Sequence, residues 1–177
     1  MTSALLPRED VRLAPLEMTH AGAMFQWMRD PTVSANVGLR TVPTLEKTQA
    51  WIARALEDDS TRPYAVLLHD RHVGNVVLDR IDRVLASARL SIYIGEAGAR
   101  GRGVGRTAIA LTLCRAFDAL ELNKVWLTVH ARNTAAITTY LAVGFVLEGV
   151  LRDEFVLDGT RLPALYMGVL AKDFRRP

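Results

Sequence analysis

Two patterns of apolar and polar residues alternate along this chain and predict its strands and helices. Short runs rich in β-branched and other apolar residues predict strands at 11–16, 64–69, 72–80, 86–94 and 124–129, from Gly144-Phe145 to Leu151, and at 162–170. Apolar residues that recur every three to four positions predict helices at 19–29, 44–56, 104–120 and 133–141, with Thr19, Thr44 and either Asn133 or Thr134 as N-caps. The segment 32–43 has no clear period and is expected to be a loop, and Asp70-Arg71 is the expected turn of a hairpin.

The order of these elements predicts the fold class. Helices come early, a meander of strands follows, and the chain then alternates strand, helix, strand, helix and strand. We therefore expect an α/β (α+β) fold in which one mixed sheet is packed against helices, with right-handed crossovers. No linker or repeat interrupts the pattern, so residues 1–177 are predicted to form one domain.

Composition excludes several classes of protein. Half of the 177 residues are apolar and the formal net charge is only +3. No apolar run approaches the roughly 20 residues of a membrane span, and the N-terminus lacks a secretory pattern, so a cytoplasmic protein with no membrane partner is expected. The arginines are scattered without interleaved aromatic residues, which disfavours nucleic acid as a partner. The single cysteine, Cys114, is expected in the core, and no metal site is expected because the histidines lack ligand spacing.

The segment 100–106 reads Arg-Gly-Arg-Gly-Val-Gly-Arg and lies between a predicted strand and a predicted helix. Exposed amides and the positive end of a helix dipole would make this turn an anion site, for which pyrophosphate is the natural ligand. The dinucleotide fingerprint does not fit, because a third glycine and a later acidic residue are not at the required places, and no NTPase loop is present. A purely structural turn is the alternative, but three arginines in one turn favour an anion.

Two further motifs follow this loop in a fixed order. Segment 100–105 fits the pattern Gln/Arg-x-x-Gly-x-Gly/Ala, Asn133 begins a helix that bears Tyr140, and Gly144-Phe145 comes next. The three motifs resemble the GNAT acetyltransferase superfamily, and 147–152 is similar to its branch of ribosomal-protein N-terminal and amino-sugar N-acetyltransferases. The resemblance extends from the second predicted strand onward. It implies a twisted, mostly antiparallel sheet with helices on both faces and splayed central strands.

The resemblance also implies acetyl-CoA as cofactor. The glycine loop would bind the pyrophosphate, the strand before it would pair with the pantetheine arm through its backbone, and Asn133 would bind that arm, unless it is only a helix cap. The expected cofactor-binding residues are Ile92, Tyr93, Ile94, Arg100, Gly101, Arg102, Gly103, Val104, Gly105, Arg106, Thr107, Asn133, Ala136 and Tyr140.

Direct acetyl transfer to a primary amine needs an acid and a base. The resemblance implies Tyr140 as the general acid that protonates the leaving thiolate, with a tyrosine of the core as the alternative. The base is left open among several residues, of which His130 and Glu96 complete the expected catalytic set with Tyr140. The remaining candidates are Tyr93, Asp153 and Glu154.

The acceptor is expected to contact residues of the first half of the chain and the last hairpin. The residues chosen are Trp27, Arg29, Asn36 and Arg152. The favoured acceptor is a nucleotide-linked amino sugar, and a protein or peptide N-terminus is the alternative. A non-catalytic acyl-CoA-binding module is an alternative of another class. The resemblance also implies a possible homodimer.

Overall fold

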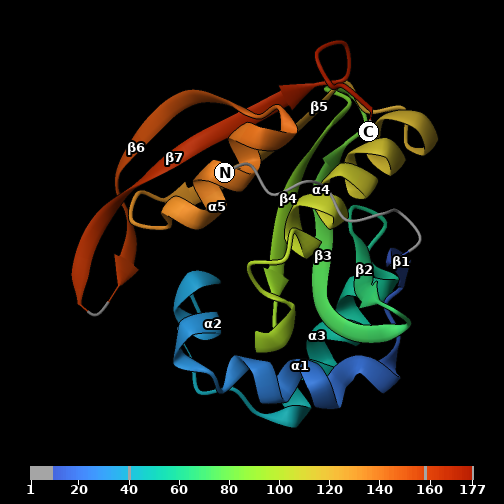
Figure 1. The fold of residues 1–177 in the computed structure, drawn as a ribbon, viewed down its shortest axis with the longest axis vertical. Coiled ribbons are helices and arrows are strands. Elements are labelled where there is room, and N and C mark those ends of the chain that lie inside the picture. The colour runs from blue at the N-terminus through green and yellow to red at the C-terminus, as the bar shows by residue number, and fades with distance from the viewer. Residues whose placement is uncertain (1–9, 40, 158, 177) are drawn as a thin grey trace.

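The computed structural model describes residues 10–39, 41–157 and 159–176 (Figure 1). Its centre is a seven-stranded sheet in the order β1-β2-β3-β4-β5-β7-β6. Only β4 and β5 run parallel, and all other neighbours are antiparallel, which confirms the predicted sheet. The strands are β1 (Val11–Pro15), β2 (Arg62–Leu68), β3 (Arg71–Asp82), β4 (Ser87–Ile94), β5 (Lys124–His130), β6 (Val146–Leu157) and β7 (Thr160–Leu170).

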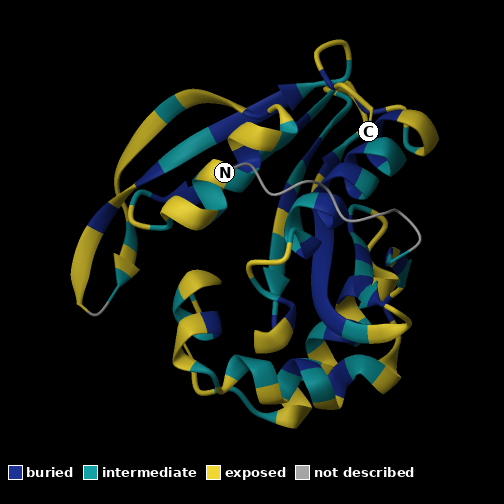
Figure 2. Cartoon of the chain, in the orientation of Figure 1, coloured by how far each residue is buried: buried dark blue, intermediate teal, exposed yellow. Residues whose placement is uncertain are grey.

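Helices cover both faces of this sheet, as predicted. On one face, α4 (Val104–Cys114) and α5 (Thr134–Val143) enclose the main core, in which Leu78, Leu113 and Phe145 are almost fully buried. On the other face, α1 (Ala21–Met28) and α3 (Leu45–Glu57) form a smaller core over β2. Figure 2 shows the contrast between the buried central strand β3 and the largely exposed β6 at the outer edge. Burial of apolar area in the two cores is the main stabilising contribution.

The two parallel strands separate soon after they meet. β4 and β5 pair at only three positions, the last of which joins Arg89 to Trp126. Beyond that position, β4 continues to pair with β3 on its other side, and β5 continues to pair with β7. The predicted splay between the central strands is therefore present, and it leaves an opening between the carboxyl ends of β4 and β5.

The expected loop at 32–43 is partly helical, so that prediction is wrong for its first residues. A short helix, α2 (Pro31–Asn36), begins directly at the Asp-Pro pair. The Asp30 carboxylate accepts a hydrogen bond from Thr32 N at 2.8 Å, and proline at the first helical position has no N–H to satisfy. The pair therefore separates α1 from α2 and also starts α2.

Four other element boundaries differ clearly from prediction. Thr19 is not an N-cap, because it lies inside the 3-10 turn η1 (Met18–His20), whose cap is Glu17. The long helix 104–120 ends as α4 at Cys114 and continues as a π-helical turn, η3 (Arg115–Ala119). The hairpin turn lies one residue early, at His69 and Asp70, which both have positive φ. Strand β6 is also longer than expected.

No helix in the described residues is long and apolar enough to span a membrane.

Contacts of the Trp27 ring connect α1 to the end of β4. The Trp27 ring lies over Gly95, where an added Cβ would come within 2.0 Å of the indole. The same indole contacts the rings of His72 and Tyr93, with centroids 4.7 and 6.2 Å away. Burial, with a smaller effect of His20, lowers the pKa of His72 to about 4. His72 is therefore neutral in the folded protein at physiological pH.

This neutral histidine predicts a loss of stability in acid. Between pH 6.5, the ordinary pKa, and about 4, the unfolded chain binds a proton at His72 that the folded chain does not. The free energy of unfolding should therefore fall as the pH falls through this window. Chemical denaturation of His72→Phe, which keeps a ring but cannot titrate, should show a smaller fall, whereas the exposed control His69→Gln should retain it. Equal slopes for His72→Phe and the unmodified chain would contradict the assignment.

Candidate active site

The glycine loop has the geometry of an anion site. Gly101 and Gly103 have φ of +72° and +84°, a region that residues with a Cβ rarely adopt. Gly103 is the N-cap of α4, and no side chain caps this helix start. The first-turn amides of α4 have no carbonyl in the helix to bind, so the N–H groups and the dipole are available to an anion.

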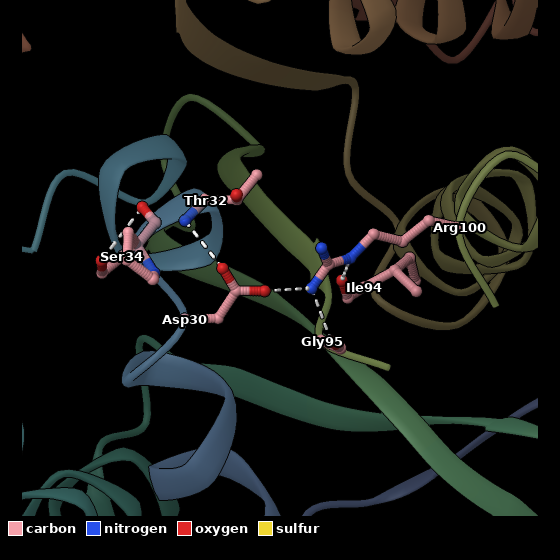
Figure 3. A network of polar contacts seen from close by, with 7 residues as sticks. Asp30, Thr32, Ser34, Ile94, Gly95 and Arg100 are labelled. Carbon is pink, nitrogen blue, oxygen red and sulfur yellow. Dashed lines mark hydrogen bonds and ion pairs between the residues drawn. The ribbon is translucent and has the colours of Figure 1, made fainter. Parts of the chain in front are cut away.

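The three loop arginines do not act alike. The Arg100 side chain turns toward the protein: Nε donates to Ile94 O at 2.9 Å, and Nη2 donates to Gly95 O at 2.6 Å and to Asp30 at 3.1 Å (Figure 3). The Asp30 carboxylate therefore offsets the charge of Arg100. The side chain of Arg100 contacts the protein itself, whereas a contact with the cofactor was expected. Arg102 is exposed, and Arg106 donates to Ala142 O at 3.4 Å.

The residues beside the loop fit coenzyme A. The Thr107 hydroxyl oxygen is buried in α4 and has no hydrogen-bond partner in the described part of the chain, so it has capacity for one more hydrogen bond. Ile92 and Ile94 pack against the main core. The β4 backbone beyond Arg89 does not pair with β5. These residues would hold the pyrophosphate and the pantetheine arm.

Asn36 brings three predicted functional groups together at the opening of the splay. Its Oδ1 accepts from Asn133 Nδ2 at 3.3 Å and lies 3.2 Å from His130 Nε2. Asn133 in turn caps α5, because its Oδ1 accepts from Ala136 N at 3.2 Å. A predicted acceptor residue, a predicted base and two predicted cofactor residues are thus linked by hydrogen bonds.

The His130 imidazole is almost buried at the end of β5. Its exposed fraction is 4%, and the Phe155 ring from β6 lies against it with centroids 4.7 Å apart. Burial, and then the charge of Arg132, lower the pKa of His130 below its ordinary value. Its Nδ1 is buried and has no hydrogen-bond partner within the described residues. A neutral imidazole with an unpaired ring nitrogen is the chemistry that a general base requires.

The two tyrosines near the site differ in their suitability. Burial raises the pKa of Tyr93 far above its usual value, and its hydroxyl donates to Asn75 at 2.9 Å, which argues against Tyr93 as the base. Burial raises the pKa of Tyr140, on α5, to about 12. Its ring packs on Phe145 in the main core, as the core alternative expected, and its hydroxyl stays protonated.

The remaining sequence candidates have no recorded contact with His130 among the described residues. Glu96 is the N-cap of the 3-10 turn η2 (Ala97–Ala99), and Arg29 donates to Gln26 on its own helix. Trp27 is used in packing against Gly95. The others, Arg152, Asp153 and Glu154, are exposed on β6. Sequence reasoning missed Asp30 and Phe155, and only the Asp-Pro helix start was a usable signal for Asp30.

Comparison with known proteins decides the family. The Acetyltransferase (GNAT) domain profile matches residues 10–146, which is most of the chain. The chain belongs to the GNAT acetyltransferase family. It is an acetyl-CoA-dependent N-acyltransferase, so its acceptor is an amine.

Individual relatives of this acetyltransferase agree. The chain is 28% identical to spermidine N(1)-acetyltransferase of Escherichia coli K12 over 96% of its own length and 85% of that protein. It is 24% identical to the putative ribosomal N-acetyltransferase YdaF of Bacillus subtilis over 96% of the chain and 90% of the relative. The fold matches spermidine N-acetyltransferase of Vibrio cholerae, solved with CoA and spermine, with a TM-score of 0.87 and 24% identity over 93% and 98% of the two chains.

The left-handed glycine predicts a sharp effect on cofactor affinity. Gly103→Ala should weaken coenzyme A binding about tenfold or more, since a residue with a Cβ adopts a φ of +84° only at a cost and the loop would have to change its conformation. Gly98→Ala is the matched control, because nothing lies within 4 Å of its added Cβ. Titration calorimetry with coenzyme A measures both, and unchanged affinity in Gly103→Ala would remove the loop from the cofactor site.

Proposed function

We propose that this enzyme transfers the acetyl group of acetyl-CoA directly to a primary amine of a small molecule, with His130 as base and Tyr140 as acid. The observation that carries the proposal is the buried, unpartnered Nδ1 of His130, which lies at the end of β5, the strand whose pairing with β4 stops at Trp126. Cys114 is only partly exposed on α4 and is not needed as an acetyl carrier in this scheme.

The residues would divide the proton transfers between them. Acetyl-CoA supplies an acetyl group activated as a thioester. The amine nitrogen forms a bond to the acetyl carbon and loses a proton to His130 Nδ1, while the bond from that carbon to sulfur breaks. Tyr140 gives its proton to the departing sulfur, directly or through one water. An unpaired backbone N–H of β4 beyond Arg89 would stabilise the charge that develops on the acetyl oxygen.

The chemistry of α2 favours an acceptor with few positive charges. The named relatives include spermidine acetyltransferases, so polyamines are one candidate class. A polyamine carries several ammonium groups and would be held by carboxylates, yet residues 31–45 contain no Asp or Glu. Within the described residues, the groups linked to His130 by hydrogen bonds, ring contact or charge are two amides, an aromatic ring and Arg132. We therefore propose a nucleotide-linked amino sugar as the acceptor, ahead of a polyamine or a peptide N-terminus.

A homo-oligomer is part of the same proposal. A relative from Vibrio cholerae is described as dodecameric. In this chain the outer strand β6 exposes Val146, Val150 and Val156 to more than half of their area, which supports self-association along that edge. Sedimentation equilibrium measures the assembly.

The base and the acid should be separable by pH. His130→Gln should lower kcat/KM by about 10²-fold and remove the acid limb of its pH profile, which lies below pH 6.5 because the pKa of His130 is lowered. Tyr140→Phe should lower kcat to a similar degree with coenzyme A affinity unchanged. A His130→Gln enzyme that keeps the rate and the acid limb would exclude His130 as the base.

The acceptor is tested by a screen. The enzyme is incubated with acetyl-CoA and amino sugars, nucleotide-linked amino sugars, polyamines or peptides, and release of free thiol is followed. The highest kcat/KM is expected for an amino sugar. Turnover of polyamines alone would show that the acceptor is a polyamine and not an amino sugar. Coenzyme A binding without turnover of any amine in the screen would reject all of the acceptor classes proposed here.

A further inference from the structure

We propose that Asn36 is a positioning residue that fixes which nitrogen of His130 carries the proton, and that the ion pair between Asp30 and Arg100 holds α2 in the place that this requires. The inference rests on the proposed role of His130 as base. It assigns a task to α2, which sequence analysis expected to be a loop.

The direction of each hydrogen bond follows from a single fixed donor. The backbone N–H of Ala136 can only donate, so it identifies the oxygen of the Asn133 amide. The other atom of that amide is therefore the NH₂ group, and it can only donate to Asn36. The Asn36 atom that receives it is an oxygen, and the same oxygen faces His130 Nε2 at 3.2 Å. Because that oxygen can only accept, Nε2 must carry the proton.

This assignment leaves Nδ1 of the neutral imidazole as the basic nitrogen. Nδ1 is the nitrogen that has no partner within the described residues. The opposite tautomer would place two lone pairs, on Nε2 and on the Asn36 oxygen, against each other. The amide oxygen of Asn36 therefore accepts a hydrogen bond from the imidazole, as a carboxylate does beside other catalytic histidines, but it adds no charge.

The position of Asn36 depends on both ends of α2. At its start, Asp30 binds Arg100, whose guanidinium also holds the carbonyls of Ile94 and Gly95 at the end of β4 (Figure 3). At its end, Asn36 reaches His130 on β5 and Asn133 at the start of α5. The helix thus connects the β4 side of the splay to the β5 side.

Few charges act on His130, so its titration reports on Asn36. α2 and α5 contribute the amides of Asn36 and Asn133, and β6 contributes the Phe155 ring. Arg132 is the one charge with a resolved effect among the described residues, and it disfavours the imidazolium. A carboxylate at position 36 would act in the opposite direction.

Nuclear magnetic resonance of the enzyme with isotope-labelled histidine tests the tautomer without turnover. The chain has four histidines, and His130→Gln assigns the signal. The unmodified enzyme at neutral pH should show Nε2 protonated and Nδ1 unprotonated. Asn36→Ala should give a mixture of the two tautomers and lower kcat/KM about tenfold, less than loss of the base itself. A signal that is unchanged in Asn36→Ala, or Nδ1 protonated in the unmodified enzyme, would overturn the inference.

Two further variants examine charge and anchoring. Asn36→Asp should raise the pKa of His130 and move the acid limb of the pH profile to higher pH, because a neighbouring carboxylate favours the imidazolium. Asp30→Asn and Arg100→Gln should both shift the tautomer signal toward the mixture, whereas Arg54→Gln on the exposed side of α3 should not. If Asp30→Asn leaves the signal unchanged, the anchoring role of the ion pair is wrong.

The outcomes separate this inference from the proposed function. A changed tautomer with an unchanged rate would retain Asn36 as the residue that orients His130 but would exclude His130 as the base. An unchanged tautomer with a lowered rate would reject the role of Asn36 and leave the base assignment standing.

Discussion

The site depends on one interruption of backbone pairing. β4 and β5 are neighbours for three residue pairs, and each then keeps only its outer partner. Backbone N–H and C=O groups that lose a strand neighbour need another partner, so the interruption creates a strand edge inside the sheet. The glycine loop follows one of these strands and the start of α5 follows the other. Groups that are distant in sequence therefore meet where the sheet opens.

Two helices that start near this opening differ in how their first-turn amides are satisfied. α4 starts at a glycine and has no side-chain cap, which leaves its amides available to an anion. α2 starts with a capping carboxylate and a proline, so its own first turn needs nothing from outside. The start of α4 is thus open to an anion, whereas the start of α2 is satisfied within the chain. Arg100 lies between them and serves the second, although its sequence context suggested the first.

Local patterns predicted the fold well because each strand and helix follows from its own residues. The residues themselves predicted the glycine loop and the capping role of Asn133, and the resemblance to the GNAT family implied the splay. The sequence did not reveal α2, because six residues are too few for an apolar period. The sequence also could not rank the candidate bases. His130 is distinguished by its burial and by its contact with Asn36, which lies 94 positions earlier in the chain. Tertiary contacts of this kind have no local signature.

The Arg100 network changes how the glycine motif should be read across related chains. Its first position contacts two carbonyls and a carboxylate that lies 70 residues earlier, not the loop that follows it. Natural selection would therefore act on that position jointly with Asp30. Homologues that replace the arginine with glutamine, which keeps hydrogen bonds but not charge, should tolerate asparagine in the Asp-Pro pair. Covariation between positions 30 and 100 would then reflect the ion pair between them and not a ligand that both residues contact.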